Sequence, residues 1–283
     1  RLFCSDGGLM RLDLHMHTDR SDGDLSPEDL VAAAVEARLD VISVTDHDTT
    51  AGVAAAMGAA MGTTLRVIPG VELSSTHEGR EVHVLGYGMD PDAPGILAHG
   101  ASARRKRVAR METMVERLGK EGIEVEMAAV RAAAGAGAAM MGRPHLARVL
   151  VDRGHAETVA HAFDTLIGDQ HPAFVPTDLG TPVEAVATVR ESGGLAVWAH
   201  PPMEVLDDLL PALVEAGLRG LEAYRPGWPP RRTRQVAARA RAHGLVVTGG
   251  SDFHGPDRNG KMGEFWVRGT LLRPFLDELG FEP

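Results

Sequence analysis

The sequence is poor in cysteine, in long apolar runs and in basic charge, and each shortage excludes a class of protein. Cys4 is the single cysteine among 283 residues, so no disulfide can form within the chain. No stretch approaches the roughly 18 consecutive apolar residues of a membrane-spanning helix, so we expect no membrane contact. Lys and Arg number 29 against 39 Asp and Glu, for a net charge of −10, which is untypical of a protein that coats nucleic acid.

The composition is that of a folded α/β protein. Hydrophobic residues make up 44% of the chain and charged residues 24%, which suits a packed core rather than disorder. Residues 1–10 contain no apolar segment followed by a small-residue cleavage site. Without such a signal or a disulfide, we expect a cytoplasmic protein, and no obligate protein partner is evident. The 13 His against one Cys indicate nitrogen and oxygen ligands for a metal instead of thiolates.

Strand and helix patterns alternate along most of the chain. Alternation of apolar and polar residues, or a short apolar run, predicts strands at 11–17, 40–45, 65–73, 82–88, 194–199, 220–224 and 245–249. Amphipathic or Ala-rich helices are expected between most of them. Repeated strand–helix units with apolar strands predict a parallel sheet, and this number of strands favours closure into a barrel.

The rhythm changes in the middle of the chain. Residues 96–119 have a helical pattern, residues 124–168 continue as short helices, and the next strand pattern is at 173–175. We therefore predict a barrel domain of residues 10–95 and 177–283 that carries the metal site. Residues 96–176 are predicted to be a mostly helical insertion that contributes to substrate binding. The basic residues of 104–110 are expected to form a solvent-exposed helix face. The alternative is that they guide the tail of an oligonucleotide substrate by binding its phosphates.

Histidines and carboxylates recur at or near the ends of the predicted strands. In parallel α/β folds the carboxyl ends of the strands form the ligand-binding mouth, so these side chains are expected to converge. Each alone would be an ordinary structural residue or helix cap, but together, without a metal, they would repel one another or stay unsatisfied. The predicted metal ligands are His15, His17, Asp22, His47, Glu72, His83, His200, Asp252 and His254.

The motifs that carry these residues resemble those of the PHP (polymerase and histidinol phosphatase) family. In chain order they are His15-x-His17, Asp22-Gly23, Thr45-Asp46-His47, Pro69-Gly70-Val71-Glu72, His83, Ala199-His200-Pro201 and Gly250-Ser251-Asp252-Phe253-His254. The match covers the whole barrel part of the chain. The resemblance implies a distorted (β/α)7 barrel, an α/β fold, with a trinuclear site for three divalent metal ions, Mn, Fe or Zn.

The resemblance also implies which residues hold which metal. The first metal would take His15, His17, Glu72 and Asp252. The second would take Glu72 as a bridge with His83 and His200, and the third would take Asp22, His47 and His254. Glu72, Asp252 and His200 are accordingly assigned to the catalytic centre. Other branches of the family carry His where Asp22 stands, and the Asp form resembles the branch that acts on nucleotides.

The insertion and its Gly142-Arg143-Pro144-His145 run are similar to the same branch, which includes 3′,5′-nucleoside bisphosphate phosphatases and 5′→3′ exoribonucleases. The resemblance implies that Arg143 clamps a substrate phosphate, a task that suits the planar guanidinium. His171 stands where related sequences usually carry Lys, and it would donate a hydrogen bond only in the right protonation state. The predicted substrate-binding residues are Arg143, His145, Arg148 and His171.

The predicted function is metal-dependent hydrolysis of nucleotide phosphate esters by a metal-activated water. The substrate would be a 3′,5′-nucleoside bisphosphate or a short 5′-phosphorylated oligonucleotide. One alternative is a phosphatase for a non-nucleotide monoester such as histidinol phosphate or a sugar phosphate. Another is a non-catalytic metal-binding PHP module, although such modules often lose ligands and all nine positions are filled here. An amidohydrolase would need a bridging carbamylated Lys, and no Lys lies at a predicted strand end.

Overall fold

The computed structural model describes residues 10–135 and 140–281, so Cys4 lies outside the described residues. In the described residues eight strands form one sheet, with the order β7-β6-β5-β4-β3-β2-β1-β8. The strands are β1 (Arg11–Met16), β2 (Val41–Val44), β3 (Arg66–His77), β4 (Arg80–Tyr87), β5 (Leu195–Trp198), β6 (Gly220–Tyr224), β7 (Val246–Gly249) and β8 (Val267–Arg268).

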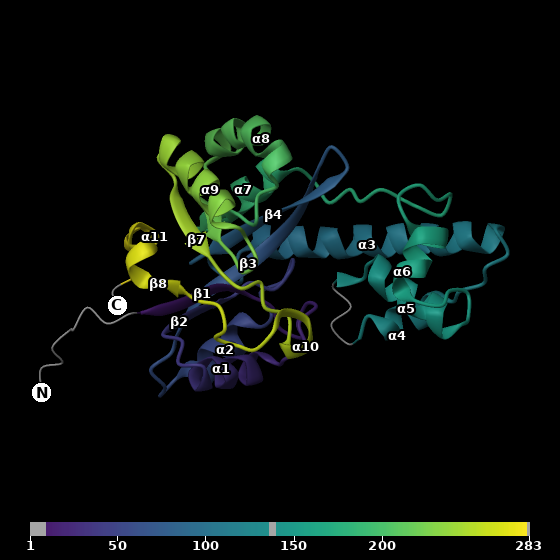
Figure 1. The fold of residues 1–283 in the computed structure, drawn as a ribbon, viewed down its shortest axis with the longest axis horizontal. Helices are drawn as coiled ribbons and strands as arrows, with labels where there is room; N and C mark the ends of the chain where they lie inside the picture. Colours follow the sequence, from purple (N-terminus) through teal and green to yellow (C-terminus); the bar gives the residue numbers. More distant parts are fainter. Residues whose placement is uncertain (1–9, 136–139, 282–283) are drawn as a thin grey trace, which may run out of the picture.

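The sheet curls so that the chain just beyond the edge strand β7 returns to β1, the neighbour of the other edge strand (Figure 1). Just beyond β7, the Phe253 N–H donates to the carbonyl oxygen of His15 at 3.2 Å, and the His17 N–H donates to that of Phe253 at 2.8 Å. Gly250 permits this approach, because a Cβ atom there would lie 2.4 Å from the Cβ of His15. The predicted distorted barrel is therefore confirmed as a nearly closed mixed sheet with helices around it.

The expectation of a parallel sheet is wrong at β4 and at the edge. β4 runs antiparallel to both β3 and β5, and β8 runs antiparallel to β1. Glu78 and Gly79 join β3 to β4 with φ angles of 49° and 77°, as a two-residue hairpin turn of type I′ requires. A connection this short excludes a parallel crossover. β8 has two residues, too few for a periodic pattern in the sequence.

Helices surround the barrel, and polar side chains cap the first turns of two of them. The Ser26 side chain accepts the N–H of Asp29 at the first helix, and Thr181 and Glu184 cap each other at another. None of the described helices is long and apolar enough to cross a membrane. The helices of the barrel are α1 (Pro27–Glu36), α2 (Val53–Ala60), α7 (Pro182–Glu191), α8 (Met203–Ala216), α9 (Pro230–Ala242), α10 (Pro256–Asn259) and α11 (Arg273–Glu278).

A long helix, α3 (Pro94–Lys120), runs from the barrel into a smaller helical lobe (Figure 1). Near its start Ile96 packs into the barrel core, whereas Met111, Met114 and Leu118 pack with Leu146 in a separate core. The helix therefore serves both cores and fixes the lobe to the barrel. The rest of the lobe consists of α4 (Met127–Ala133), α5 (Arg143–Asp152), α6 (Val159–Ala162) and a π-helical turn (Phe163–Ile167).

Residues 173–175, where a strand pattern was expected, form no strand. Arginine side chains of α3 satisfy their carbonyl groups in place of a neighbouring strand. Arg110 Nε donates to the carbonyl oxygen of Val175 at 2.7 Å, and Arg117 Nη1 donates to that of Phe174 at 2.5 Å. These hydrogen bonds hold the segment against α3.

Candidate metal centre and substrate cleft

The nine predicted ligands come from separate parts of the chain and converge at one end of the barrel. His15 lies on β1, and its side chain is fully buried. Glu72 lies on β3 and His83 on β4. Ser74 pairs with His83 across these two strands, and Glu72 pairs with Leu85, so Glu72 and His83 share a face of the sheet. The remaining six follow β1, β2, β5 or β7: His17, Asp22, His47, His200, Asp252 and His254.

Glu72 lies at the middle of this cluster, and its side chain is fully buried. Its two oxygens face different rings, which is the arrangement expected of a bridging carboxylate. From Oε2 the distances are 3.2 Å to His15 Nε2, 3.3 Å to His17 Nε2 and 3.2 Å to His47 Nδ1. From Oε1 the distances are 3.1 Å to His83 Nδ1 and 3.1 Å to His200 Nε2.

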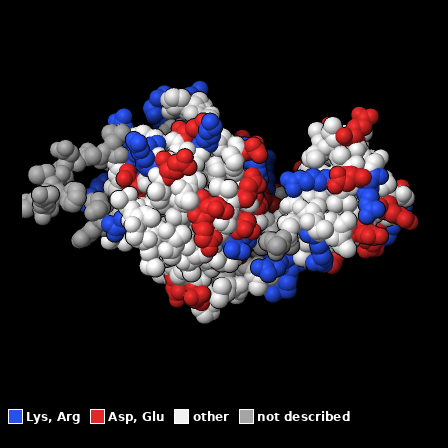
Figure 2. All heavy atoms as spheres, turned by 90° about the horizontal axis from the view of Figure 1, so that it is seen from below, with Lys and Arg blue, Asp and Glu red and all other residues white. Residues whose placement is uncertain are grey.

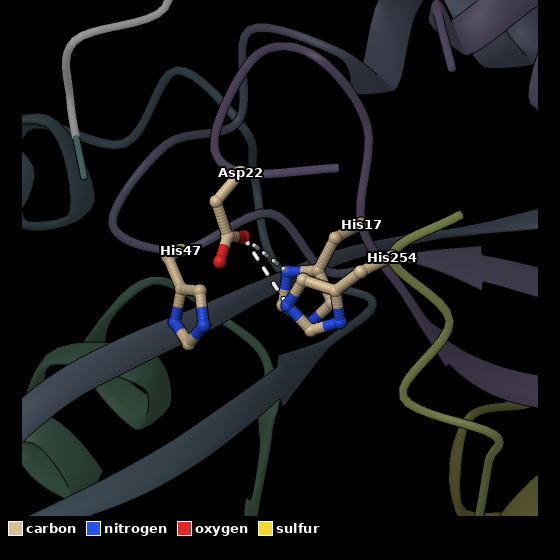
Figure 3. A group of neighbouring side chains, drawn as sticks. All are labelled: His17, Asp22, His47 and His254. Atoms are coloured by element: carbon tan, nitrogen blue, oxygen red, sulfur yellow. Dashed lines mark ion pairs between the residues drawn. The ribbon is translucent and has the colours of Figure 1, made fainter. Parts of the chain in front are cut away.

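Two further carboxylates flank Glu72. Asp252 Oδ1 lies 3.2 Å from His15 Nε2 and 3.1 Å from His17 Nε2. Asp22 Oδ1 lies 3.7 Å from His17 Nδ1 and 3.3 Å from His254 Nε2. Figure 3 shows the Asp22 carboxylate facing these rings, with His47 beside it. His17 therefore stands between the two carboxylates, with one ring nitrogen toward each.

The spacing of the donor atoms marks out three groups, each with its donors within 4.8 Å of one another. They are His17, Asp22, His47 and His254; His15, His17, Glu72 and Asp252; and His47, Glu72 and His83. The second group is the set assigned to the first metal from the resemblance. In the third group His47 stands where the resemblance assigned His200, although the His200 ring also contacts Glu72.

The donor atoms fit a divalent metal. His15 Nε2, His17 Nδ1, His47 Nδ1 and Glu72 Oε2 are buried and make no hydrogen bond. An unpaired buried polar atom is destabilising by about 1–3 kcal/mol, so four in one place call for a common partner. Imidazole nitrogens and carboxylate oxygens together suit Mn, Fe or Zn, and such an ion would satisfy these atoms at once.

Burial and the neighbouring charges shift the pKa values of several residues in the cluster. Burial opposes the charge of Glu72, but the rings of His47 and His15 outweigh it and hold the pKa of Glu72 well below its usual range. Burial lowers the pKa of His47 to about 4, so its ring is neutral at pH 7. At His83 the Glu72 carboxylate overcomes burial and raises the pKa to about 10. Metal binding to His83 would therefore release a proton.

The backbone is strained at two of the predicted ligands. His200 has a φ of 31° and Asp252 a φ of 55°, values that non-glycine residues adopt only at a cost of order 1 kcal/mol or more. Such outliers persist where the surrounding structure determines them. Here the strain directs two side chains toward Glu72 and its neighbours.

A cleft of about 1040 Å³ adjoins the cluster, between the barrel and the helical lobe. Asp22 lines it together with Arg143, His145 and Arg148, three of the predicted substrate-binding residues. Figure 2 shows basic side chains beside acidic ones at the junction of the barrel and the helical lobe. Eight arginines line the cleft against four acidic residues, Asp19, Asp22, Asp24 and Glu81, so its lining is net positive in an acidic chain. The eight arginines that line the cleft are Arg20, Arg104, Arg107, Arg110, Arg131, Arg143, Arg148 and Arg258.

The predicted substrate-binding residues differ in their surroundings. The Arg143 guanidinium lies over the rings of Phe174 and Phe163, 5.0 and 5.4 Å from their centres, and its Nη1 is 2.5 Å from Asp169 Oδ1. His145 accepts the N–H of Gly142 at 3.1 Å through Nδ1. These contacts fix both side chains in the wall of the cleft.

The structure does not bring His171 to the cleft. It is absent from the lining residues, and its Nε2 donates to the carbonyl oxygen of Asp164 at 2.7 Å. His171 stands in the loop that follows the π-helical turn, so the position expected to meet phosphate faces the lobe instead.

The solvated face expected over 104–110 is wrong for Arg107. Its side chain is buried, with Nη1 2.5 Å from Asp48 Oδ2, and Nη2 donates to Ser74 Oγ at 2.9 Å. Gly100, two turns earlier on α3, lets the helix approach the same loop, because a Cβ there would lie 2.1 Å from the Asp48 carbonyl oxygen. Arg110 is half-buried and lines the cleft with Arg107.

Sequence reasoning missed two residues that contact the cluster from β6 and the loop after it. Glu222 is fully buried and lies against His15, and Arg225 contacts Asp252. The one signal available was a charged residue inside the apolar segment 220–224. A buried carboxylate without a partner in its own strand is a candidate for a functional site.

Comparison with known proteins gives a consistent picture. Residues 13–176 match the PHP domain family. The chain is 36% identical over 251 residues to the 5′-3′ exoribonuclease Rnm of Escherichia coli (strain K12), covering 86% of this chain and 85% of that protein. It is 31% identical over 284 residues to the 3′,5′-nucleoside bisphosphate phosphatase of Chromobacterium violaceum, covering 96% and 97%. A crystal structure from Bifidobacterium adolescentis, named provisionally as a metal-dependent phosphoesterase, superposes with a TM-score of 0.79 at 34% identity, covering 94% and 95%.

Proposed function

The chain belongs to the PHP domain family, and from that premise we propose that it is a metal-dependent phosphoesterase that hydrolyses phosphate esters of nucleotides. The observation that carries the proposal is a cluster of buried nitrogen and oxygen donors, several of which make no hydrogen bond, beside an arginine-lined cleft. The donors suit divalent metals, and the arginines suit phosphate.

We assign the nine converging residues to three divalent ions, Mn, Fe or Zn. Glu72 is the proposed bridge, because each of its oxygens faces a separate set of rings. Asp252 completes one end of the cluster and His200 the other, and Asp22, His47 and His254 form the side nearest the cleft. Bound ions would supply an ionised water at neutral pH and positive charge beside the phosphoryl oxygens.

The cleft would hold the nucleotide. Arg143 and Arg148 are placed to bind its phosphates, with His145 between them on α5. Burial and the nearby charge of Arg143 lower the pKa of Arg110, so like charges are held together here in a partly buried place. An anion between them would relieve this repulsion, which supports a phosphate at this wall. In this proposal the insertion of residues 96–176 supplies the substrate-binding wall, and the barrel of residues 10–95 and 177–283 supplies the metal centre.

The substrate would be a 3′,5′-nucleoside bisphosphate or a short 5′-phosphorylated oligonucleotide. Two relatives carry the corresponding names, a bisphosphate phosphatase and a 5′-3′ exoribonuclease. The cleft volume of about 1040 Å³ is at the upper end of the range for small-molecule sites, so it has room for more than a single phosphate group.

The experiment is a substrate panel with Mn²⁺-loaded protein and chromatographic separation of the products. A 5′-phosphorylated diribonucleotide, a 3′,5′-bisphosphate and a sugar phosphate would be incubated in parallel. Release of a 5′-mononucleotide identifies a phosphodiesterase, and inorganic phosphate from the bisphosphate alone identifies a nucleotide phosphatase. Turnover of the sugar phosphate alone, or of nothing, would overturn the proposal.

A matched pair of histidine variants tests whether the cluster is responsible. His17→Ala removes a ring that contacts Glu72 and Asp252, so it should lose both metal and turnover. His243→Ala changes an exposed histidine at the end of α9 and should keep both. Metal content would be measured by mass spectrometry, and full turnover by His17→Ala would contradict the assignment.

A further inference from the structure

Glu222 connects two of the proposed ligands through its two carboxylate oxygens. It lies on β6, and its side chain is fully buried. Oε1 lies 2.9 Å from His15 Nδ1, and Oε2 accepts the backbone N–H of His200 at 2.9 Å. A buried carboxylate is costly unless it is paired and hydrogen-bonded, and here each oxygen contacts one of the proposed metal ligands.

The contact with His15 decides which ring nitrogen is available. An ionised carboxylate can only accept hydrogen bonds, so the hydrogen of the His15 ring must be on Nδ1. When the ring is neutral, as metal binding requires, its lone pair is then on Nε2, which faces Glu72 Oε2 at 3.2 Å and Asp252 Oδ1 at 3.2 Å. That Nε2 is one of the buried atoms without a hydrogen-bond partner. Glu222 therefore turns the donor atom of His15 toward the centre of the cluster.

The contact with His200 holds a strained backbone. The φ of His200 is 31°, and its N–H points to Glu222 instead of a neighbouring strand. In this conformation His200 Nε2 reaches Glu72 Oε1 at 3.1 Å. Loss of the acceptor would remove the bond that opposes relaxation of this residue.

Arg225 extends the same support to the third carboxylate of the centre. Its Nη2 lies 2.6 Å from Asp252 Oδ2, and its Nη1 lies 4.0 Å from Glu222 Oε2. Asp252 therefore keeps Oδ1 for the side of His15 and His17. The three residues form a chain of charges behind the ligand atoms.

We propose that Glu222 is a positioning residue of the metal centre, which orients His15 and His200 and thereby sets the affinity for the metal without binding metal or substrate itself. The inference rests on the metal centre in the proposed function and is independent of the identity of the phosphate ester. Outer partners of metal-ligating histidines generally contribute 10–100-fold to metal affinity, so the expected effect is about that size.

The test is the Glu222→Gln variant, which keeps the size of the side chain. In one orientation of the new carboxamide its NH2 group faces the His200 N–H, and that hydrogen bond is lost. In the other orientation the NH2 group donates to His15 Nδ1, which moves the ring hydrogen to Nε2 and removes the lone pair from the side of the metal. Dissociation constants for Zn²⁺ and Mn²⁺ would be measured by competition with a chromophoric chelator. We expect both to rise by about 10–100-fold. The control is Glu278→Gln, which makes the same change on the surface at α11, where Glu278 pairs with Arg219.

Two further readouts separate positioning from support of the fold. At raised Mn²⁺ the turnover of Glu222→Gln should return to the wild-type level, with the half-saturating metal concentration shifted by the same factor. Unchanged metal affinity, or a fall in the metal-free melting temperature with normal affinity, would overturn the proposal. Should Glu222→Gln not fold, Glu222→Asp keeps the charge but shortens the reach to two partners, and the same loss of affinity is expected. Wild-type protein that binds no metal would instead overturn the proposed function.

Discussion

The ion pair of Arg107 and Asp48 fastens α3 to the barrel beside the metal centre, and removing it should be strongly destabilising. The Arg107 and Asp48 side chains are 6% and 2% exposed, with Nη1 2.5 Å from Oδ2. Removing one partner of a buried pair costs about 3–5 kcal/mol, because the other charge is left uncompensated. In Arg107→Ala the Asp48 carboxylate would keep the N–H of Ser74 at 2.8 Å. We therefore expect a loss at the lower end, about 3 kcal/mol.

The assay is urea unfolding of the metal-free protein at pH 7, followed by circular dichroism. A loss of about 3 kcal/mol is a large part of the roughly 5–15 kcal/mol of a typical domain, so the midpoint should fall visibly with little change in slope. Arg105→Ala is the matched control, since Arg105 lies two residues away on the same helix and is exposed. It should change stability by less than about 0.5 kcal/mol. A loss below about 1 kcal/mol in Arg107→Ala would refute the argument.

The same variant has a pH dependence of known sign. Burial opposes the charge of Asp48, but His99 and Arg107 outweigh it and keep the pKa of Asp48 well below its usual range. A lowered folded-state pKa means that the stabilisation is complete above about pH 4, the ordinary value for Asp, and declines as the pH falls through the lowered value. Arg107→Ala should therefore cost less at pH 3 than at pH 7, and an equal cost would exclude an electrostatic origin.

Three further predictions concern packing, a buried carboxyl and the cleft. Gly100→Ala would place a Cβ 2.1 Å from the Asp48 carbonyl oxygen and should lower the free energy of unfolding by about 1–3 kcal/mol. Gly119→Ala, in open space on the same helix, should raise it by up to about 1 kcal/mol, and equal effects in urea unfolding would contradict the close approach. Burial raises the pKa of Asp13 to about 7. The contribution of its protonated carboxyl to the free energy of unfolding is therefore complete below about pH 4 and is lost as the pH rises through about 7. Asp13→Asn should accordingly stabilise the metal-free protein at pH 8 and hardly at pH 4, and a difference independent of pH in thermal melts would contradict this. Arg143→Ala should raise the KM for the nucleotide substrate by about tenfold or more, because the substrate loses a hydrogen bond to a charged group. The metal content should stay unchanged. Arg153 is exposed at the end of α5, and Arg153→Ala should leave the KM unchanged. Equal steady-state kinetics in the two variants would show that Arg143 does not bind the substrate.

Much of the barrel follows from local patterns in the sequence. Alternation in 11–17 places His15 and His17 on one side of β1, and Ser26 and Thr181 mark the starts of α1 and α7. Strand ends meet at one edge of such a fold, which is why residues from 15 to 254 could be placed together. The antiparallel course of β4 depends on the turn at Glu78 and Gly79, whose positive φ angles the strand pattern does not reveal.

The contacts that sequence patterns could not reveal are long-range ones between charges. Arg107 stands in a run of basic residues that looks like a solvated helix face, and its partner Asp48 is 59 positions away. Glu222 contacts His15 at a separation of 207 positions. No local rule pairs such residues, because burial of a charge is decided by the tertiary partner and not by helix or strand period.

The most direct test of the metal centre is anomalous diffraction from crystals soaked in Zn²⁺. The account predicts three peaks at the end of the barrel around Glu72, at about 2.0–2.2 Å from the donor nitrogens and oxygens. One peak should lie between His15, His17, Glu72 and Asp252, and one should lie beside Asp22 and His254, facing the cleft. Crystals with no peak near Glu72, or with peaks only at surface histidines, would contradict the central claim.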